Sequence, residues 1–171
     1  MTTIFSSIQK VFLYIMLVLI GLYAGMLFFH QMAPVETQLN PIDYAKYWKI
    51  VDGTFMHSRM RIMAPGMMIM FILTILLFIK DWKSLTFLFL VLSFIFFFLD
   101  VRLTLNHQLP INVFINELDL KNITELQTKQ LISYQATAIS NFETRFVHGI
   151  ISFALLCLTP FFLPRLIRQN K

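Results

Sequence analysis

Four apolar stretches constrain this chain more than any other feature of its sequence. They cover residues 11–29, 62–79, 84–99 and 149–164. Each approaches the length of about 20 apolar residues that a transmembrane helix needs. Composition agrees, because 57% of the 171 residues are hydrophobic and 13% are charged, against roughly 25% charged residues in soluble domains. The sequence therefore predicts an all-α, four-transmembrane-helix bundle, with residues 1–171 as one integral-membrane domain, and excludes a two-domain soluble enzyme.

The basic side chains of the short loops orient these spans. Lys10 precedes the first span, and Lys80 and Lys83 lie in the turn between the second and the third. The basic residues after the last span are Arg165, Arg168 and Lys171. Because Lys and Arg in short loops favour the cytoplasmic side, we expect a multi-pass protein of the cell membrane with both termini in the cytoplasm. Residues 31–61 and 100–148 then face outward.

The formal net charge of +5 does not indicate nucleic acid as a partner, because the basic residues are scattered between apolar stretches. The expected partners are the lipid bilayer and a small hydrophobic molecule. Gly21 and Gly25 form a GxxxG pair in the first span. Such a pair permits close approach of another helix, either within the chain or in a homo-oligomer.

The outward segments carry helix signals of their own. Asn40 and Pro41 are a typical cap and first-turn proline, and we expect the helix that begins there to continue into the second span. Neither Gly nor Pro occurs from Thr124 to His148, so the fourth span also begins as a helix outside the membrane. Helices two and four are thus predicted to extend beyond the bilayer. Residues 106–121 are predicted to form an irregular cap that turns around Pro110.

All four histidines lie beside the outward ends of the spans. They are His30, His57, His107 and His148. An antiparallel topology brings them to one end of the bundle. Two histidines from facing helices are typical axial ligands of haem, which makes these four the candidate cofactor ligands. The plainer alternative is four interfacial histidines that pair with water or backbone.

Polar residues recur at helical spacing near the same end. His57 and Arg61 are four residues apart on the second helix. The third helix carries Asp100, Thr104 and His107 on one face, and the fourth carries Asn141, Arg145, His148 and Ser152. Ionisable groups at membrane depth face the bundle interior and mark functional sites. We therefore pair Asp100 with Arg61 or Arg145. The residues predicted to line one water-accessible cavity are His57, Arg61, Asp100, Arg145 and His148. The alternative is that the arginines snorkel at the interface.

Methionines follow one stripe of the second helix, at positions 56, 60, 63, 67 and 70. Thioethers are ligands of Cu(I), so a copper site beside His57 is one interpretation of this stripe. Flexible packing is the other, because methionine fills irregular apolar space. No metal is expected at the site under the second interpretation.

The sequence resembles the anthrone oxygenase-like family of small four-span membrane proteins. The resemblance rests on GLYAGMLFFHQMAPVETQL followed by YAKYWKIVDGTF, and on NHQLPINVFINEL at the exit of the third span. The last of these is similar to an Asn-x-Pro-hydrophobic-Asn pattern, carried here by Asn106, Pro110, Asn112 and Asn116. The fourth span begins with Asn141, Phe142 and Arg145, which resembles an arrangement of an aromatic residue, an Asn and an Arg in the family.

The resemblance implies oxidation of an anthrone to an anthraquinone with dioxygen, without metal or flavin. Such a reaction needs a base, a cation beside the enolate oxygen, and an apolar pocket. His148 or His57 is the expected base, and Arg145 or Arg61 is the expected cation. Asp100 and Asn112 complete the candidate catalytic set. The expected function is oxidation of a small hydrophobic aromatic or quinone-like molecule by a cofactor-independent oxygenase. A haem- or copper-binding redox protein and a noncatalytic assembly or scaffold subunit are the alternatives.

Overall fold

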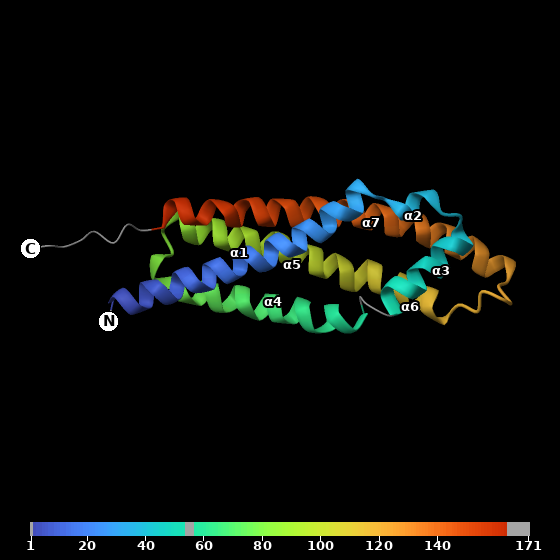
Figure 1. The fold of residues 1–171 in the computed structure, drawn as a ribbon, viewed down its shortest axis with the longest axis horizontal. Coiled ribbons are helices and arrows are strands. Elements are labelled where there is room, and N and C mark those ends of the chain that lie inside the picture. The colour runs from blue at the N-terminus through green and yellow to red at the C-terminus, as the bar shows by residue number, and fades with distance from the viewer. Residues whose placement is uncertain (1, 54–56, 164–171) are drawn as a thin grey trace, which may run out of the picture.

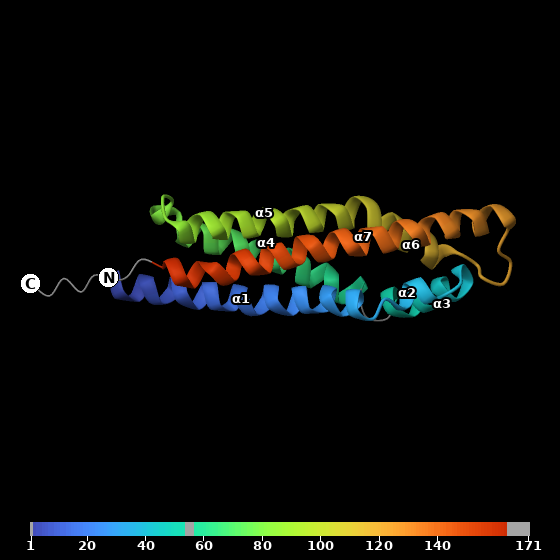
Figure 2. The same cartoon turned by 90° about the horizontal axis from the view of Figure 1, so that it is seen from above.

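The computed structural model describes the backbone of residues 2–53 and 57–163, and the side chains of 6–53 and 59–163. Four long helices run along its longest axis (Figure 1). They are α1 (Thr2–Met32), α4 (His57–Leu77), α5 (Leu85–Leu103) and α7 (Glu125–Leu158). The view from above shows α1 and α5 on opposite sides of α7 (Figure 2).

Four helical segments are long and apolar enough to cross a membrane. They cover Ser6–Gln38, Arg59–Leu77, Leu85–Glu117 and Glu125–Phe162. This confirms the predicted all-α architecture with four spans. We call the end of the bundle with the α4–α5 turn the terminal end, because α1 begins there and α7 ends there (Figure 1). The opposite end is the cap end.

A short turn joins α4 to α5 at the terminal end, as the sequence predicts. It contains the 3-10 helix η2 (Ile79–Asp81). Ser84 then caps α5, and its side chain accepts a hydrogen bond from the Phe87 backbone N–H at 3.1 Å. Such a cap satisfies one of the N–H groups that have no partner in the first turn of a helix.

Shorter helices build the cap end. They are α2 (Val35–Gln38), α3 (Pro41–Val51) and α6 (Leu109–Glu117). With the N-terminal half of α7 they enclose a second apolar core, which includes Tyr44, Trp48, Ile111, Ile115 and Leu131. The 34 residues of α7 make a helix of about 51 Å at about 1.5 Å per residue, which is longer than the roughly 30 Å hydrocarbon core of a bilayer. The predicted extension of the fourth helix is therefore confirmed.

The expected single helix from Pro41 into the second span is wrong. Helix α3 ends at Val51, and α4 is a separate helix that begins at His57. Tertiary packing explains the difference, because α3 buries Tyr44 and Trp48 in the cap core. A helix that continued straight into α4 would leave those two rings outside that core.

The predicted irregular segment around Pro110 is also wrong. A π-helical turn, η3 (Thr104–Gln108), continues α5 and leads directly into α6. Pro110 lies in the first turn of α6, where a missing backbone N–H leaves no hydrogen bond unmade. The third span therefore extends beyond the bundle and contributes to the cap.

Helices α1 and α7 approach closely in the middle of the bundle. A Cβ atom on Gly149 would lie 2.5 Å from Leu27 Cδ1, and one on Gly21 would lie 3.1 Å from the Phe153 ring. Gly21 thus packs against α7 of the same chain, while nothing lies within 4 Å of a Cβ on Gly25. The close helix approach that the GxxxG pair predicts occurs within the chain at Gly21, and the homo-oligomer stays a prediction.

Candidate functional site

A buried ion pair joins three of the long helices. Arg145 of α7 donates from Nε to Asp100 Oδ1 of α5 at 2.9 Å, and the side chains of the two residues are 9% and 0% exposed. Tyr23 of α1 donates its hydroxyl proton to Asp100 Oδ2. The Tyr23 oxygen in turn accepts from Arg145 Nη2 at 3.0 Å. We call these three residues the ion-paired cluster, and the predicted pairing of Asp100 with Arg145 is confirmed.

Aromatic rings enclose this cluster. The Arg145 guanidinium carbon lies 5.7 Å from the centroid of the Phe142 ring, and Phe97 packs edge-on against Tyr23 with 5.6 Å between centroids. Burying a charge is unfavourable unless a partner and hydrogen bonds replace its water. Here the carboxylate of Asp100 accepts from two side chains, which meets that condition.

A cavity of about 630 Å³ lies next to the cluster, between the bundle and the cap. Its polar lining residues are Tyr23, Asp52, Arg61, Gln108, Asn112 and Arg145. Its methionine lining residues are Met26, Met60, Met63, Met67 and Met68. This volume lies within the roughly 300–1,000 Å³ range of small-molecule sites. A few polar groups on a mostly apolar wall are typical of such sites.

A second set of polar contacts fixes the cap side of the cavity. The carboxylate of Asp52 accepts from Asn116 Nδ2 at 2.7 Å and from Asn112 Nδ2 at 3.2 Å. The Asn112 amide oxygen accepts from Trp48 Nε1 at 2.8 Å and from Gln108 Nε2 at 2.9 Å. We call these five residues the amide cluster. It ties α3 to α6 and to the π-helical turn.

The two clusters meet through α7. Asn141 lies one turn before Arg145 on the buried face of that helix, and its Nδ2 donates to Gln108 Oε1 at 3.3 Å. One helix thus contributes to both sides of the cavity. The polar stripe that the sequence shows on α7 is an interior stripe.

The structure brings three predicted site residues to the cavity wall, namely Arg61, Asn112 and Arg145. Asp100 lies behind the wall, where it is bound to Arg145 and Tyr23. Helix α4 begins at His57, but the side chain of His57 lies outside the described residues. The prediction of one shared cavity therefore holds for the two arginines.

The structure does not bring His148 to the cavity. Its ring lies 6.1 Å from the Phe96 ring, between centroids, and its Nδ1 atom is buried without a hydrogen-bond partner among the described side chains. The physical reason is helical phase, because a separation of three residues turns a side chain about 60° away from Arg145. The assumption that Arg145 and His148 address one substrate is thereby corrected.

The other histidines do not converge either. His30 Nδ1 lies 3.2 Å from Glu36 Oε1, and the His30 ring stacks on Phe142 at 5.1 Å between centroids. His107 is exposed in the π-helical turn. Within residues 2–53 and 57–163 no group of three or more His, Cys, Asp or Glu side chains is placed to hold a metal ion. These contacts give His30 an ion-pair partner in the cap.

Sequence reasoning missed Tyr23, Asp52 and Trp48. Tyr23 carries a hydroxyl group in an otherwise apolar span, which is a signal that the search for charged residues passed over. Asp52 and Trp48 lie four residues apart near the end of α3, and this spacing places them on one helix face. Both residues fall in a segment that was interpreted only as a support for the second span.

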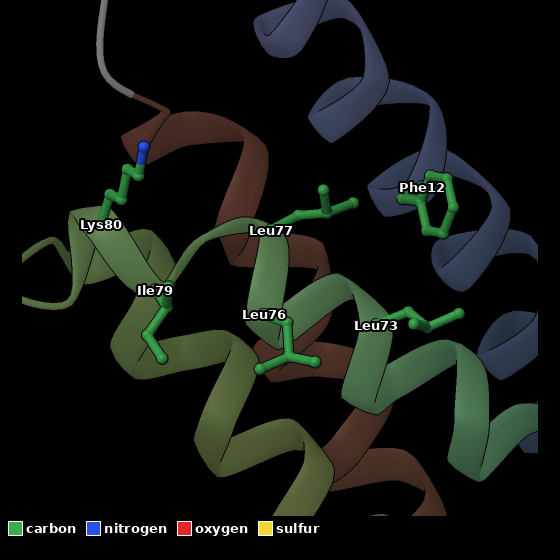
Figure 3. Close-up of a pocket in the computed structure, with 6 residues that line it drawn as sticks. All are labelled: Phe12, Leu73, Leu76, Leu77, Ile79 and Lys80. Carbon is green, nitrogen blue, oxygen red and sulfur yellow. The ribbon is translucent and has the colours of Figure 1, made fainter.

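A smaller apolar pocket of about 320 Å³ lies at the terminal end. Figure 3 shows its lining, with Phe12 on α1 facing Leu73 and Leu77 of α4. Lys80 is the single charged residue at its edge. This pocket has no buried polar group, so the cavity at the cap end is the candidate functional site.

Comparisons with known proteins give this chain no relative. No model of a protein family, no curated protein and no solved structure matches it. The geometry of the cavity and its two polar clusters is therefore what bears on function.

Proposed function

We propose that this chain resides in the cell membrane with cytoplasmic termini, binds a small hydrophobic aromatic or quinone-like molecule in the cavity, and oxidises it with dioxygen without a cofactor. The single observation that carries the proposal is the Arg145 guanidinium, which is buried and yet lines an otherwise largely apolar cavity. A fixed cation in an apolar site stabilises an oxyanion more strongly than water does. The likeness to anthrone oxygenases points to the same chemistry.

The reaction starts with a methylene group between two aryl rings, beside a ring carbonyl. A base removes one C–H proton, and the negative charge moves to the carbonyl oxygen, where Arg145 and the Tyr23 hydroxyl stabilise it. The electron-rich carbon then reduces dioxygen, so that a C–O bond forms and the distal oxygen takes up a proton. Loss of water from this hydroperoxide gives the new ketone. One methylene compound and one dioxygen thus yield one ketone and one water.

Asp52 is the base in this proposal. Its carboxylate lines the cavity, and Asn112 and Asn116 hold both of its oxygens. A general base must lie within reach of the proton that it removes, which favours Asp52 over His148. The methionine wall supplies a polarizable surface for the aromatic rings.

Dioxygen consumption by the purified protein in lipid nanodiscs, with anthrone as the substrate, tests the proposal. We expect Asp52→Asn to reduce kcat about 10²–10⁴-fold, as loss of a general base does. Arg145→Lys should reduce it roughly 10²–10³-fold, as loss of an oxyanion partner does. Arg102→Gln is the matched control, because Arg102 is exposed on α5. Absence of dioxygen uptake by the wild-type protein, or full activity of both variants, would overturn the proposal.

The proposed orientation is tested by cysteine labelling from outside the cell. Cys157 is the one cysteine of the sequence, so Cys157→Ser gives a background without thiols. We expect an impermeant reagent to modify Asp119→Cys and not Trp82→Cys in that background. The reverse pattern would place the termini outside.

The methionine wall favours one second candidate function, binding of Cu(I). Titration of Cu(I) into the purified protein against a chromophoric chelator tests it, with Met63→Leu and Met67→Leu as variants. A visible absorption spectrum of the same sample tests the haem alternative, because bound haem absorbs strongly there.

A further inference from the structure

We propose that the cavity opens sideways into the bilayer between α4 and the segment η3–α6, and that its ligand is an aromatic headgroup with a long apolar tail that arrives from the membrane. The oxidation of that headgroup rests on the proposed function, whereas the lateral opening rests on the structure of the cavity wall.

Three aliphatic residues mark the opening. Ile69, Leu105 and Leu109 line the cavity, and they are also 58%, 57% and 38% exposed. A residue that both lines a cavity and lies on the surface marks a place where the two are continuous. These residues come from α4 on one side and from η3 and α6 on the other. The edge of the opening is therefore apolar, which suits contact with lipid chains.

The position of Ile69 along α4 gives the depth of the opening. Arg61 lies near the start of the membrane-spanning segment Arg59–Leu77 and lines the cavity. Ile69 lies two turns further on, which is about 12 Å deeper at about 1.5 Å per residue. A hydrocarbon core of about 30 Å places this depth among the lipid chains. The opening thus reaches from the membrane surface into the apolar interior.

Polar and apolar lining residues occupy different ends of the cavity. Asp52 and Asn112 belong to the cap, whereas Met67, Ile69 and Phe97 belong to the spans. Arg145 and Tyr23 lie between these groups, at the ion-paired cluster. A ligand that places its oxygen atoms on Arg145 and Asp52 has its apolar part beside Met67 and Ile69. A tail on that part then reaches the lipid without burying a polar group.

The wall helix α4 contains a built-in weak point at this level. Pro65 lines the cavity inside α4, and an interior proline removes one backbone hydrogen bond of its helix. The pocket of Figure 3 offers no comparable arrangement, because it has neither a buried ion pair nor a polar wall. The features of a tailed ligand site therefore occur together at the cap end.

Fluorescence of Trp48 tests the proposal independently of any reaction. The sequence contains two tryptophans, so Trp82→Phe leaves Trp48 in the cavity wall as the single fluorophore. Quinones quench indole emission by accepting an electron. The probes are a benzoquinone with a decyl tail and the same benzoquinone without it, added to nanodiscs of palmitoyl-oleoyl phosphatidylcholine. We expect the tailed quinone to quench at a concentration about tenfold lower or better, which corresponds to about 1.4 kcal/mol.

Variants at the opening separate lateral access from general partitioning. In the Trp82→Phe background, Ile69→Phe combined with Leu105→Phe narrows the opening and should weaken quenching by the tailed quinone about tenfold. Ile72→Phe is the matched control, because Ile72 is an exposed residue of α4 that does not line the cavity. Trp48→Phe, which retains Trp82, measures quenching by quinone that is merely dissolved in the bilayer. It should show equal quenching with and without the variants at the opening.

The outcomes distinguish this proposal from the oxidation. Equal quenching of Trp48 by the two quinones, or an unchanged response of the narrowed variant, overturns the lateral opening even if anthrone is oxidised. Selective quenching that the narrowed variant loses supports the opening even if no dioxygen is consumed.

Discussion

The two polar clusters on either side of the cavity solve the same problem in different ways. The ion-paired cluster buries a full positive and a full negative charge among three spans, with a tyrosine hydroxyl between them. The amide cluster joins cap segments through neutral side chains and one carboxylate. The first depends on charge neutralisation, and the second depends on several ordinary hydrogen bonds.

This difference teaches what each cluster contributes. Removing one member of a buried ion pair leaves an uncompensated charge, which is among the largest single-residue effects on stability. Removing one member of an amide network leaves donors or acceptors unpaired, at a smaller cost for each. The bundle should therefore be the brittle side of the cavity, and the cap should be the tolerant side.

The largest effect is expected for Asp100→Ala. It leaves Arg145 buried without its carboxylate and should lower the free energy of unfolding by about 3–5 kcal/mol. The double variant Asp100→Leu with Arg145→Leu removes both charges and should recover most of that loss. Thermal unfolding in detergent measures both. If the double variant is as unstable as the single one, charge neutralisation is not what holds this cluster together.

A smaller loss is expected for Asn112→Ala in the amide cluster. The substitution leaves the buried Trp48 N–H and the Gln108 amide without their acceptor, and unsatisfied groups of this kind cost about 1–3 kcal/mol each. Asn106→Ala is the matched control, because Asn106 is exposed in the π-helical turn. Comparable unfolding temperatures for the two variants would show that the amide cluster contributes nothing to stability.

Two glycine substitutions sharpen the comparison within the bundle. Gly149→Ala places a Cβ atom 2.5 Å from Leu27 Cδ1, and overpacking of this kind costs about 1–3 kcal/mol. We expect the low end of that range, because the contacted atom is the tip of a side chain. Gly25→Ala meets open space and should stabilise α1 by about 0.5–1 kcal/mol. Chemical denaturation of the two variants side by side provides the measurement, and a destabilised Gly25→Ala variant would contradict this expectation.

The smallest effect concerns pH at the start of α3. Lys46 donates to Asp43 at 2.9 Å and Asn40 donates to it at 2.7 Å, and these hydrogen bonds lower the pKa of the Asp43 carboxyl below its ordinary value of 3.8. A carboxyl whose pKa is lowered by folding stabilises the folded state above its unfolded pKa, and this contribution is lost as the pH falls below it. Unfolding temperatures at pH 7 and pH 3 should therefore converge slightly between the wild-type protein and Asp43→Asn. An identical difference at both pH values would remove Asp43 from the account.

Much of the fold could be predicted from the sequence because membrane spans have a strong one-dimensional signal. Runs of apolar residues predicted all four spans, and Asp100 with Arg145 was predicted because a buried charge requires a partner. The end of α3 was missed because helix signals record where a helix can form. They do not record that Tyr44 and Trp48 pack into a separate core.

The site was harder to predict because it depends on helical phase and on neutral side chains. The Arg145 and His148 positions differ by one turn in the sequence, yet only Arg145 lies on the cavity wall. Tyr23 and Trp48 carry no charge, so hydropathy patterns treat them as packing residues. Asp52 became a candidate only when α6 was seen to bring Asn112 and Asn116 to its carboxylate.

The π-helical turn at Thr104–Gln108 has a consequence for sequence length. The N–H of Leu109 donates to the Thr104 carbonyl, five residues back, so this turn holds one residue more than an α-helical turn would. Deleting a single residue here would restore regular α-helix, and it would rotate everything that follows by about 100° relative to α5. Asn112 and Asn116 would then turn away from Asp52, although neither had been changed. The surplus residue thus acts as an angular spacer, and the cap tolerates substitutions near it more readily than a change in length.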